Sequence, residues 1–139
     1  VLFRSVRVGG GSNHRMGLFD MVLVKDNHIA AAGGVLEALA VVKKNNAQNL
    51  MVEMEVENFD QLRALLNKGV DVIMLDNMSN ETMAEALKII RESGDKCLVE
   101  GSGNMTLERA KEIATLGLDF ISVGALTHSV KALDISMRI

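Results

Sequence analysis

The chain contains no proline, tyrosine or tryptophan, and it has one cysteine among its 139 residues. A single thiol cannot form a disulfide within the chain, so a disulfide framework is excluded, and the apolar run around Cys97 favours a reducing cytoplasm. A globular chain that has neither proline nor an initial methionine is unusual. We therefore expect this sequence to be a piece of a longer protein.

Long apolar runs and strongly basic segments are also missing. No stretch of 18 or more apolar residues occurs, so no segment is expected to span a membrane, and residues 1–5 are too few for a signal peptide. The net charge is −3 and the only aromatic residues are four phenylalanines, which argues against nucleic acid as the main partner. Hydrophobic residues make up 48% of the chain, which is enough for one domain with a core.

Acidic and apolar residues alternate from Val52 to Glu57. As a strand, this segment places Glu53, Glu55 and Glu57 on one face and apolar residues on the other. Two carboxylates on one face lie about 7 Å apart and repel by roughly 2 kcal/mol at an effective dielectric of about 20. A solvated edge strand would remove most of that repulsion, and this is the ordinary interpretation. The ends of the neighbouring strands favour a polar pocket instead.

Strands and helices are predicted to alternate along most of the chain. The strands are expected at 21–25, 50–56, 70–75, 97–100 and 120–123. The helices are expected at about 34–46, from the cap Asn58 to Gly69, from the cap Ser79 to about Ser93, and from the cap Thr106 to Gly117. A loop is expected around the glycine triplet within 6–17, a turn at 26–28, a short helix at 126–131 and a short closing strand at 133–135.

The residues at the carboxyl ends of the strands distinguish two folds that both fit this alternation. A doubly wound sheet needs two apolar faces, whereas a (β/α) barrel has one face that turns polar toward the ends of its strands. Lys25, Asp76, Ser102 and Gly124 are polar or small residues at those ends, and the opposite faces are apolar. The fold class is therefore predicted to be α/β, a partial (β/α) barrel. Five strands cannot close an eight-stranded barrel, so we expect earlier strands to be missing.

Two segments after late strands can hold phosphate. Residues 101–104, Gly-Ser-Gly-Asn, lead into the helix capped by Thr106, and residues 124–129, Gly-Ala-Leu-Thr-His-Ser, lead into a short helix. Small residues let backbone N–H groups approach an anion, and helix N-termini favour negative charge. The alternative is that each segment is only a turn, which is the usual role of a glycine-rich βα connection.

Charged residues of three strands are expected to meet near these loops. Glu55 and Asp76 can hold a metal ion, contact ribose hydroxyls or favour a cationic transition state. Lys25 can pair with Glu55 or bind an anionic substrate. The structural alternative is a buried carboxylate paired with Lys25. Glu53 and Glu57 are interpreted as residues that flank the site.

Two basic residues follow the glycine triplet, His14 and Arg15. They are either exposed loop residues or a cationic grip on a carboxylate, for which arginine supplies a bidentate fork. His28 is expected to shape the turn after Lys25. No Cys/His cluster with zinc spacing and no nucleophile motif occurs in the sequence.

Six ordered motifs together resemble the quinolinate phosphoribosyltransferase family, also called nicotinate-nucleotide pyrophosphorylase (carboxylating). The resemblance covers about Val6 to Ile139. The motifs are HRMGL at 14–18, LVKDNHI at 23–29, EMEVE at 53–57, LDN at 75–77, EGSGN at 100–104 and VGALTHS at 123–129.

The resemblance implies a type II phosphoribosyltransferase that acts with Mg²⁺. Such an enzyme joins quinolinate to phosphoribosyl pyrophosphate and releases pyrophosphate and CO₂, yielding nicotinate mononucleotide for NAD biosynthesis. It implies catalytic roles for Lys25, Glu55 and Asp76, the last two as metal ligands. The same three residues would also bind substrate. His14, Arg15 and Lys25 would bind the quinolinate carboxylates. The phosphates would be bound by Ser102, Gly103, Gly124 and His128.

The resemblance also implies what this chain lacks. An N-terminal domain and the first barrel strands are absent, so residues 6–139 are expected to be the C-terminal portion of the catalytic barrel, and residues 1–5 a leader of uncertain origin. We expect a homodimer or higher homo-oligomer, and little or no activity from this chain alone. Two alternatives stay open: a pyrophosphorylase-like paralogue with another substrate, and a non-catalytic folded fragment.

Overall fold

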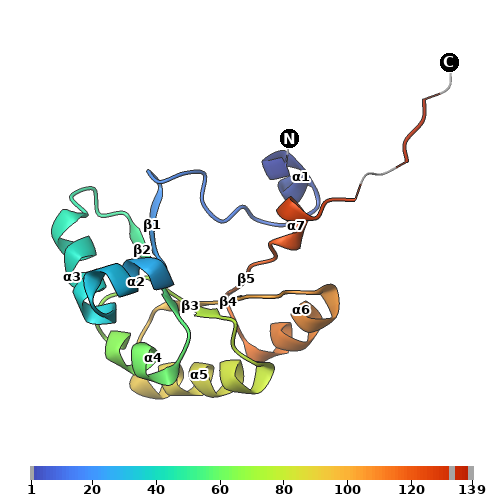
Figure 1. Cartoon of the computed structure of the whole chain (residues 1–139). Helices are drawn as coiled ribbons and strands as arrows, with labels where there is room; N and C mark the ends of the chain where they lie inside the picture. Colours follow the sequence, from blue (N-terminus) through green and yellow to red (C-terminus); the bar gives the residue numbers. More distant parts are fainter. Residues whose placement is uncertain (1, 132–133, 138–139) are drawn as a thin grey trace.

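Five parallel strands form one sheet in chain order in the computed structural model, which describes residues 2–131 and 134–137 (Figure 1). Each neighbouring pair along the sheet is parallel, as expected for successive βα units. The strands are β1 (Met21–Val24), β2 (Met51–Val56), β3 (Val72–Asp76), β4 (Leu98–Ser102) and β5 (Phe120–Ile121). The predicted α/β class, with five parallel strands, is confirmed.

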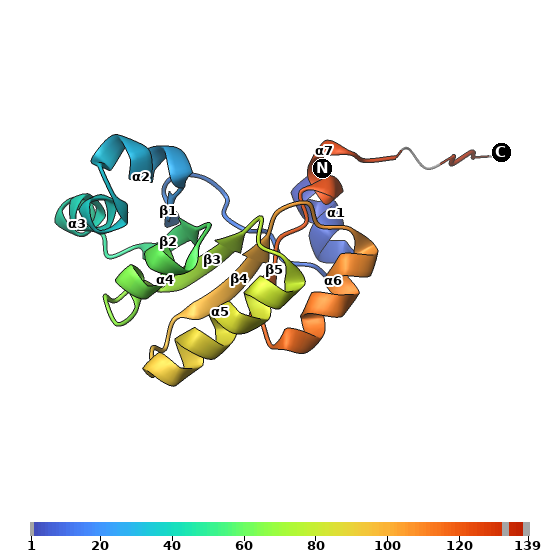
Figure 2. The same ribbon diagram turned by 60° about the horizontal axis from the view of Figure 1, so that its bottom comes forward.

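The connections between successive strands contain helices. These are α2 (Asp26–Ala32), α3 (Val35–Asn45), α4 (Phe59–Leu65), α5 (Asn80–Ser93), α6 (Leu107–Ile113) and the short 3₁₀ turn η1 (Ala114–Leu116). Before the sheet lies α1 (Leu2–Val8), and after it lies α7 (Ala125–His128). In Figure 1 the segment between α1 and β1 passes on the opposite side of the sheet from α4 and α5, and Figure 2 shows α5 running along the sheet.

The core lies between the sheet and these helices. Strand residues on the face predicted to be apolar, such as Met54, Ile73 and Leu75, have no solvent exposure. They belong to one buried cluster with the helix residues Leu62, Leu65, Met83, Ala86 and Ile113. Each large apolar side chain buried here contributes about 1.5–3 kcal/mol relative to its exposed state. The opposite face carries the polar side chains Glu53, Glu55 and Glu100 beside the apolar Val72 and Met74.

The predicted helix caps are confirmed. The side chains of Asn58, Ser79 and Thr106 each accept a hydrogen bond from a backbone N–H three residues later. Gly94 and Gly117 follow the α5 and α6–η1 segments in the left-handed conformation. One end differs, because α4 ends at Leu65 rather than continuing to Gly69.

Several short elements differ from the prediction. The expected turn at 26–28 is the first turn of α2, because the Nδ1 atom of His28 accepts the backbone N–H of Lys25 at 3.0 Å and Ile29 is buried. Residues 6–8 continue α1, and the loop begins only at the glycine triplet. The expected helix at 126–131 is α7, at 125–128. For the expected strand at 133–135, residue 133 lies outside the described residues and 134–135 are not in a strand.

Candidate active site

The predicted rim residues lie at the carboxyl ends of neighbouring parallel strands. Glu55 of β2 is opposite Met74 of β3, and Asp76 of β3 is opposite Ser102 of β4. Lys25 directly follows β1. Because parallel strands place their carboxyl ends at one edge of the sheet, the side chains that sequence reasoning selected come from one rim.

Glu55 is the buried acid of this rim, with 7% of its surface exposed. Burial, and next the charge of Asp76, raise the pKa of the Glu55 carboxyl, and Lys25 opposes this shift. Among the described residues, Lys25 and Glu55 do not form an ion pair within 4 Å. The charge of Lys25 therefore lessens the rise in the pKa of Glu55, although the two side chains do not form a direct ion pair.

A third carboxylate completes an acidic cluster. Glu55, Glu57 and Asp76 each offer an oxygen, and these oxygens lie within 4.8 Å of one another. The sequence indicates only a flanking role for Glu57, which lies one position beyond β2 on the side-chain face of Glu55. Alternation cannot show its proximity to Asp76, because that contact depends on where the segments after β2 and β3 end in space.

The loop after β4 packs closely on the loop after β3. The backbone N–H of Asn77 donates to the carbonyl oxygen of Ser102 at 3.3 Å, and its side-chain amide donates to Asp76. Gly103 has φ +89°, and a Cβ atom there would lie 2.6 Å from the backbone nitrogen of Asn77. Only glycine fits this contact, so the first predicted phosphate segment is held against the end of β3, where Asp76 lies.

Arg109 of α6 joins the same two loops, and sequence reasoning missed it. Its half-buried guanidinium donates to the carbonyl oxygen of Gly103 at 2.6 Å, to the carbonyl oxygen of Met78, and to the side-chain oxygen of Asn80 at 3.2 Å. Its place in the first turn of a helix does not predict these hydrogen bonds, because the partners come from two separate loops.

We expect Arg109→Met to lower the free energy of unfolding by about 2 kcal/mol, because two loop carbonyls lose their charged donor while the side-chain length is kept. Urea denaturation of the 139-residue chain measures this. Lys111→Met, at an exposed position of the same helix, is the matched control and is expected to change little. An equal effect of both substitutions would show that the guanidinium bonds contribute nothing.

The second predicted phosphate segment forms α7 and the residues around it. Gly124 directly precedes this four-residue helix, and the ring of exposed His128 lies over it, since a Cβ at Gly124 would be 3.2 Å from the imidazole. The Nδ1 atom of His128 forms a hydrogen bond of 2.7 Å with the Ser129 hydroxyl. The structure thus pairs two of the predicted phosphate residues, Gly124 and His128.

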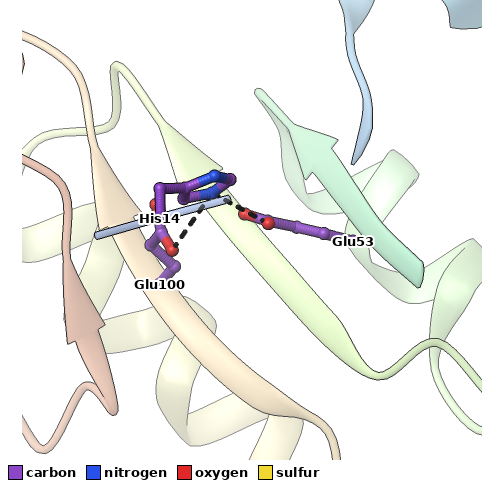
Figure 3. Close-up of side chains that lie close together, drawn as sticks. All are labelled: His14, Glu53 and Glu100. Atoms are coloured by element: carbon purple, nitrogen blue, oxygen red, sulfur yellow. Dashed lines mark ion pairs between the residues drawn. The ribbon is translucent and has the colours of Figure 1, made fainter. Parts of the chain in front are cut away.

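His14 reaches across the polar face of the sheet and contacts two buried acids (Figure 3). Its Nε2 atom lies 3.0 Å from Glu53 on β2 and 3.7 Å from Glu100 on β4. The flanking role assigned to Glu53, and the absence of any role for Glu100, are therefore incomplete. The neighbouring Arg15 donates to the carbonyl oxygen of Met21 at 3.3 Å, so this side chain is anchored beside β1.

One cavity lies away from these residues. It measures about 490 Å³ and is lined by Arg4, Arg7, Val8, Asn13 and Met16 of α1 and the following loop. None of the predicted site residues lines it. We place the candidate site at the carboxyl ends of the strands because buried Glu55, the close glycine contact and Lys25 lie there, whereas Arg15 is anchored at the amino end of β1.

Comparisons with known proteins all point to one protein family. Residues 2–138 match the family model described as quinolinate phosphoribosyl transferase, C-terminal domain. Over 133 residues the chain is 44% identical to a probable nicotinate-nucleotide pyrophosphorylase [carboxylating] of Synechocystis, covering 96% of this chain and 45% of that protein. It is 43% identical to the Bacillus subtilis protein of the same description, covering 97% of this chain and 46% of the relative.

Solved structures agree with the sequence matches. The structure of NadC from Streptococcus pyogenes matches with a TM-score of 0.89 and 42% identity, covering 99% of this chain and 47% of that one. The nicotinate-nucleotide pyrophosphorylase of Francisella tularensis matches with a TM-score of 0.85 and 46% identity, covering 95% and 46%. The chain spans about half the length of the curated relatives it matches, consistent with a partial barrel. The predicted division at residue 5 stays a prediction.

Proposed function

The chain belongs to the quinolinate phosphoribosyltransferase family, and on that premise we propose that the complete gene product containing it, here termed the complete protein, makes nicotinate mononucleotide. The reaction transfers the phosphoribosyl group of phosphoribosyl pyrophosphate to quinolinate and releases pyrophosphate and CO₂. The observation that carries the proposal is the rim on which Lys25, buried Glu55 and Asp76 meet beside the Gly103 loop.

The basic residues suit the dicarboxylate substrate. Lys25 is exposed at the end of β1, and Arg15 is anchored beside the first residue of that strand. Together with His14 they supply positive charge for two carboxylates, and arginine and lysine donors form charge-assisted hydrogen bonds of this kind. We assign quinolinate binding to these three residues.

The acidic residues suit the ribose. Breaking the bond to pyrophosphate builds positive charge on the ribose ring, and fixed carboxylates that face this charge lower the barrier. Glu55 is held in place by its burial in β2, and Asp76 by the side-chain amide of Asn77. We assign catalytic roles to Glu55 and Asp76, with Lys25 as the catalytic cation of the substrate site.

The acidic cluster also fits Mg²⁺. Oxygen ligands from carboxylates are those that Mg²⁺ prefers, and the oxygens of Glu55, Glu57 and Asp76 lie close together. Burial raises the pKa of Glu55 most, and the charge of Asp76 adds to this, so a bound cation would favour the ionised cluster. Glu55 and Asp76 would hold the ion. When bound, it supplies positive charge that stabilises the departing pyrophosphate.

The two glycine loops suit the phosphates. Ser102 and Gly103 lie beside Asp76 across the β3–β4 pair, and Gly124 and His128 lie together at α7. Small residues leave backbone N–H groups accessible to phosphate oxygens, and the Ser102 hydroxyl and the His128 ring add donors. We assign phosphate binding to these four residues.

An assay of the complete protein tests the proposal. Quinolinate, phosphoribosyl pyrophosphate and Mg²⁺ are expected to give nicotinate mononucleotide. Binding of phosphoribosyl pyrophosphate without any quinolinate reaction would instead identify a paralogue with another substrate, although the presence of His14, Arg15 and Lys25 favours quinolinate. A complete protein that neither binds nor reacts would contradict both.

The 139-residue chain by itself is expected to show little or no turnover, because it spans about half of its relatives. We expect it to retain binding of phosphoribosyl pyrophosphate with Mg²⁺, since the acidic residues and both glycine loops lie within it. Titration calorimetry on the purified chain measures this. No heat of binding would favour a non-catalytic folded fragment, and measurable turnover would contradict the expected inactivity.

Location and assembly are further proposals. We propose a cytoplasmic enzyme that forms a homodimer or higher homo-oligomer, with small-molecule substrates and no nucleic-acid partner. Some relatives, such as a Nicotiana tabacum quinolinate phosphoribosyltransferase, are described as mitochondrial. Every helix in residues 2–131 and 134–137 is too short or too polar to cross a lipid bilayer.

A further inference from the structure

The His14 contact joins three distant parts of the chain. His14 comes from the loop that follows the glycine triplet, Glu53 from β2 and Glu100 from β4 (Figure 3). The imidazole therefore spans β3, which lies between the other two strands. Both acids approach the same ring atom, Nε2, at 3.0 Å and 3.7 Å.

The two acids are unusually buried. Glu53 is 1% exposed and Glu100 is 4% exposed. Within the described residues, one oxygen of Glu53, Oε1, is buried without a hydrogen-bond partner. A buried carboxylate that is not fully hydrogen-bonded destabilises a fold, and apolar replacements of such pairs are often neutral or stabilising. Stability alone therefore does not explain these two acids.

A neighbouring hydroxyl directs Glu100 toward His14. The hydroxyl of Ser122 donates to Oε1 of Glu100, which leaves Oε2 of Glu100 facing the ring. Burial raises the pKa of Glu100 most, and the charge of Glu53 adds to this. The other charged group that acts on the ring is the adjacent Arg15, which opposes its protonation.

The ring has one nitrogen left for a ligand. Within residues 2–131 and 134–137, Nδ1 of His14 has no hydrogen-bond partner, whereas Nε2 is occupied by the acids. A neutral imidazole with its proton on Nε2 presents a lone pair at Nδ1, which repels a carboxylate. A neutral ring with its proton on Nδ1 would instead turn the Nε2 lone pair toward the two acids, so only the charged ring can donate to them from Nε2 and to a substrate carboxylate from Nδ1.

We propose that Glu53 and Glu100 are positioning residues that hold His14 as a cation whose Nδ1–H group binds a ring carboxylate of the substrate. The proposal rests on the proposed function and deepens it, because it explains how a histidine can recognise an anion. The raised pKa of His14 supports it: the hydrogen bond from Glu53 is the largest cause, burial opposes it, and the charges of Glu53 and Glu100 add to it.

Steady-state kinetics of the complete protein provide the first test. Glu53→Gln and Glu100→Gln are each expected to raise KM for quinolinate about tenfold, the cost of one weakened charge-assisted hydrogen bond, and to leave KM for phosphoribosyl pyrophosphate unchanged. A variant ring that has lost one acid partner keeps its proton only at lower pH, so the penalty should be smallest at low pH, where both the variant and the unmodified ring are charged. Glu100→Asp keeps the charge and should recover part of the loss.

NMR titration of the 139-residue chain provides the second test. The chain has three histidines, so His28 and His128 serve as internal controls for His14. His14 is expected to hold its proton to higher pH in the unmodified chain than in the Glu53→Gln chain, while the signals of the other two histidines respond equally in both. A His14 titration that Glu53→Gln leaves unchanged, or variants that raise both KM values equally, would overturn the proposal. An unmodified complete protein that makes no nicotinate mononucleotide would instead refute the proposed function, leaving the NMR result to decide the role of the two acids.

Discussion

Glu55→Gln is expected to lower kcat of the complete protein about 100- to 1000-fold, the usual effect of removing one preorganised charge that faces a developing charge. The substitution keeps the size of the side chain and its place in the buried strand β2. It removes the negative charge beside Asp76 and keeps one side-chain oxygen that can still act as a ligand to Mg²⁺. Because the loss belongs to the transition state, KM values should change far less than kcat.

The same substitution is expected to stabilise the fold at neutral pH. Burial first, and the charge of Asp76 second, raise the pKa of Glu55 in the folded protein. The folded state therefore binds more protons than the unfolded state between the usual pKa of glutamate and this raised pKa, and the free energy of unfolding falls as pH rises through that window. Glutamine has no such titration, so the variant avoids the loss.

Lower activity with higher stability distinguishes a catalytic role from structural damage. The change in kcat is measured by stopped-time assays of nicotinate mononucleotide formation by the complete protein. The change in the free energy of unfolding is measured by urea denaturation of the 139-residue chain at several pH values. Glu85→Gln, at an exposed position on α5, is the matched control and should alter neither. A Glu55→Gln protein with near-normal kcat, or with lower stability at neutral pH, would contradict the assigned role.

Gly103→Ala is expected to lower the free energy of unfolding by about 3 kcal/mol or more. A methyl group there would lie 2.6 Å from the backbone nitrogen and 2.8 Å from the Cα atom of Asn77, so one of the two loops must move. The positive φ adds about 1 kcal/mol, and forced overpacking typically adds 1–3 kcal/mol.

Gly33→Ala is a close control for this substitution. Gly33 has the same φ of +89° at the end of α2, but a Cβ atom there meets nothing within 4 Å. The two variants thus share the conformational cost, and their difference in urea denaturation isolates the contact with Asn77. In the complete protein, only Gly103→Ala should raise KM for phosphoribosyl pyrophosphate. Equal effects of the two substitutions would show that the loop contact does not matter.

Local rules predicted most of the fold. Asn58, Ser79 and Thr106 cap helices because a short polar side chain can accept the N–H of a residue three positions later, whatever surrounds it. The first turn of α2 escaped prediction because a histidine accepts the N–H of Lys25 there, a less common cap than serine or asparagine. The α7 segment is four residues long, too short for periodicity to set its ends.

The residues of the candidate site were likewise predicted only in part from local rules. Period-two alternation and parallel pairing predict from the sequence alone that Glu55, Asp76 and Ser102 lie at one edge of the sheet, as the register shows. Nothing local indicates that Arg109 bonds to the carbonyls of two loops, or that Glu57 approaches Asp76, because those contacts depend on where separate loops end in space.

The amino-acid sequence alone determined the order of strands and helices, the face of each strand that is buried and the rim where polar residues collect. These follow from backbone geometry and hydrophobic burial, which act over a few neighbouring residues. Only the tertiary structure decided that the loop after α1 crosses the polar face and places His14 between Glu53 and Glu100. The physical reason is that this contact joins a loop to two strands separated by a third, and its geometry is set by packing of the whole sheet rather than by any local preference.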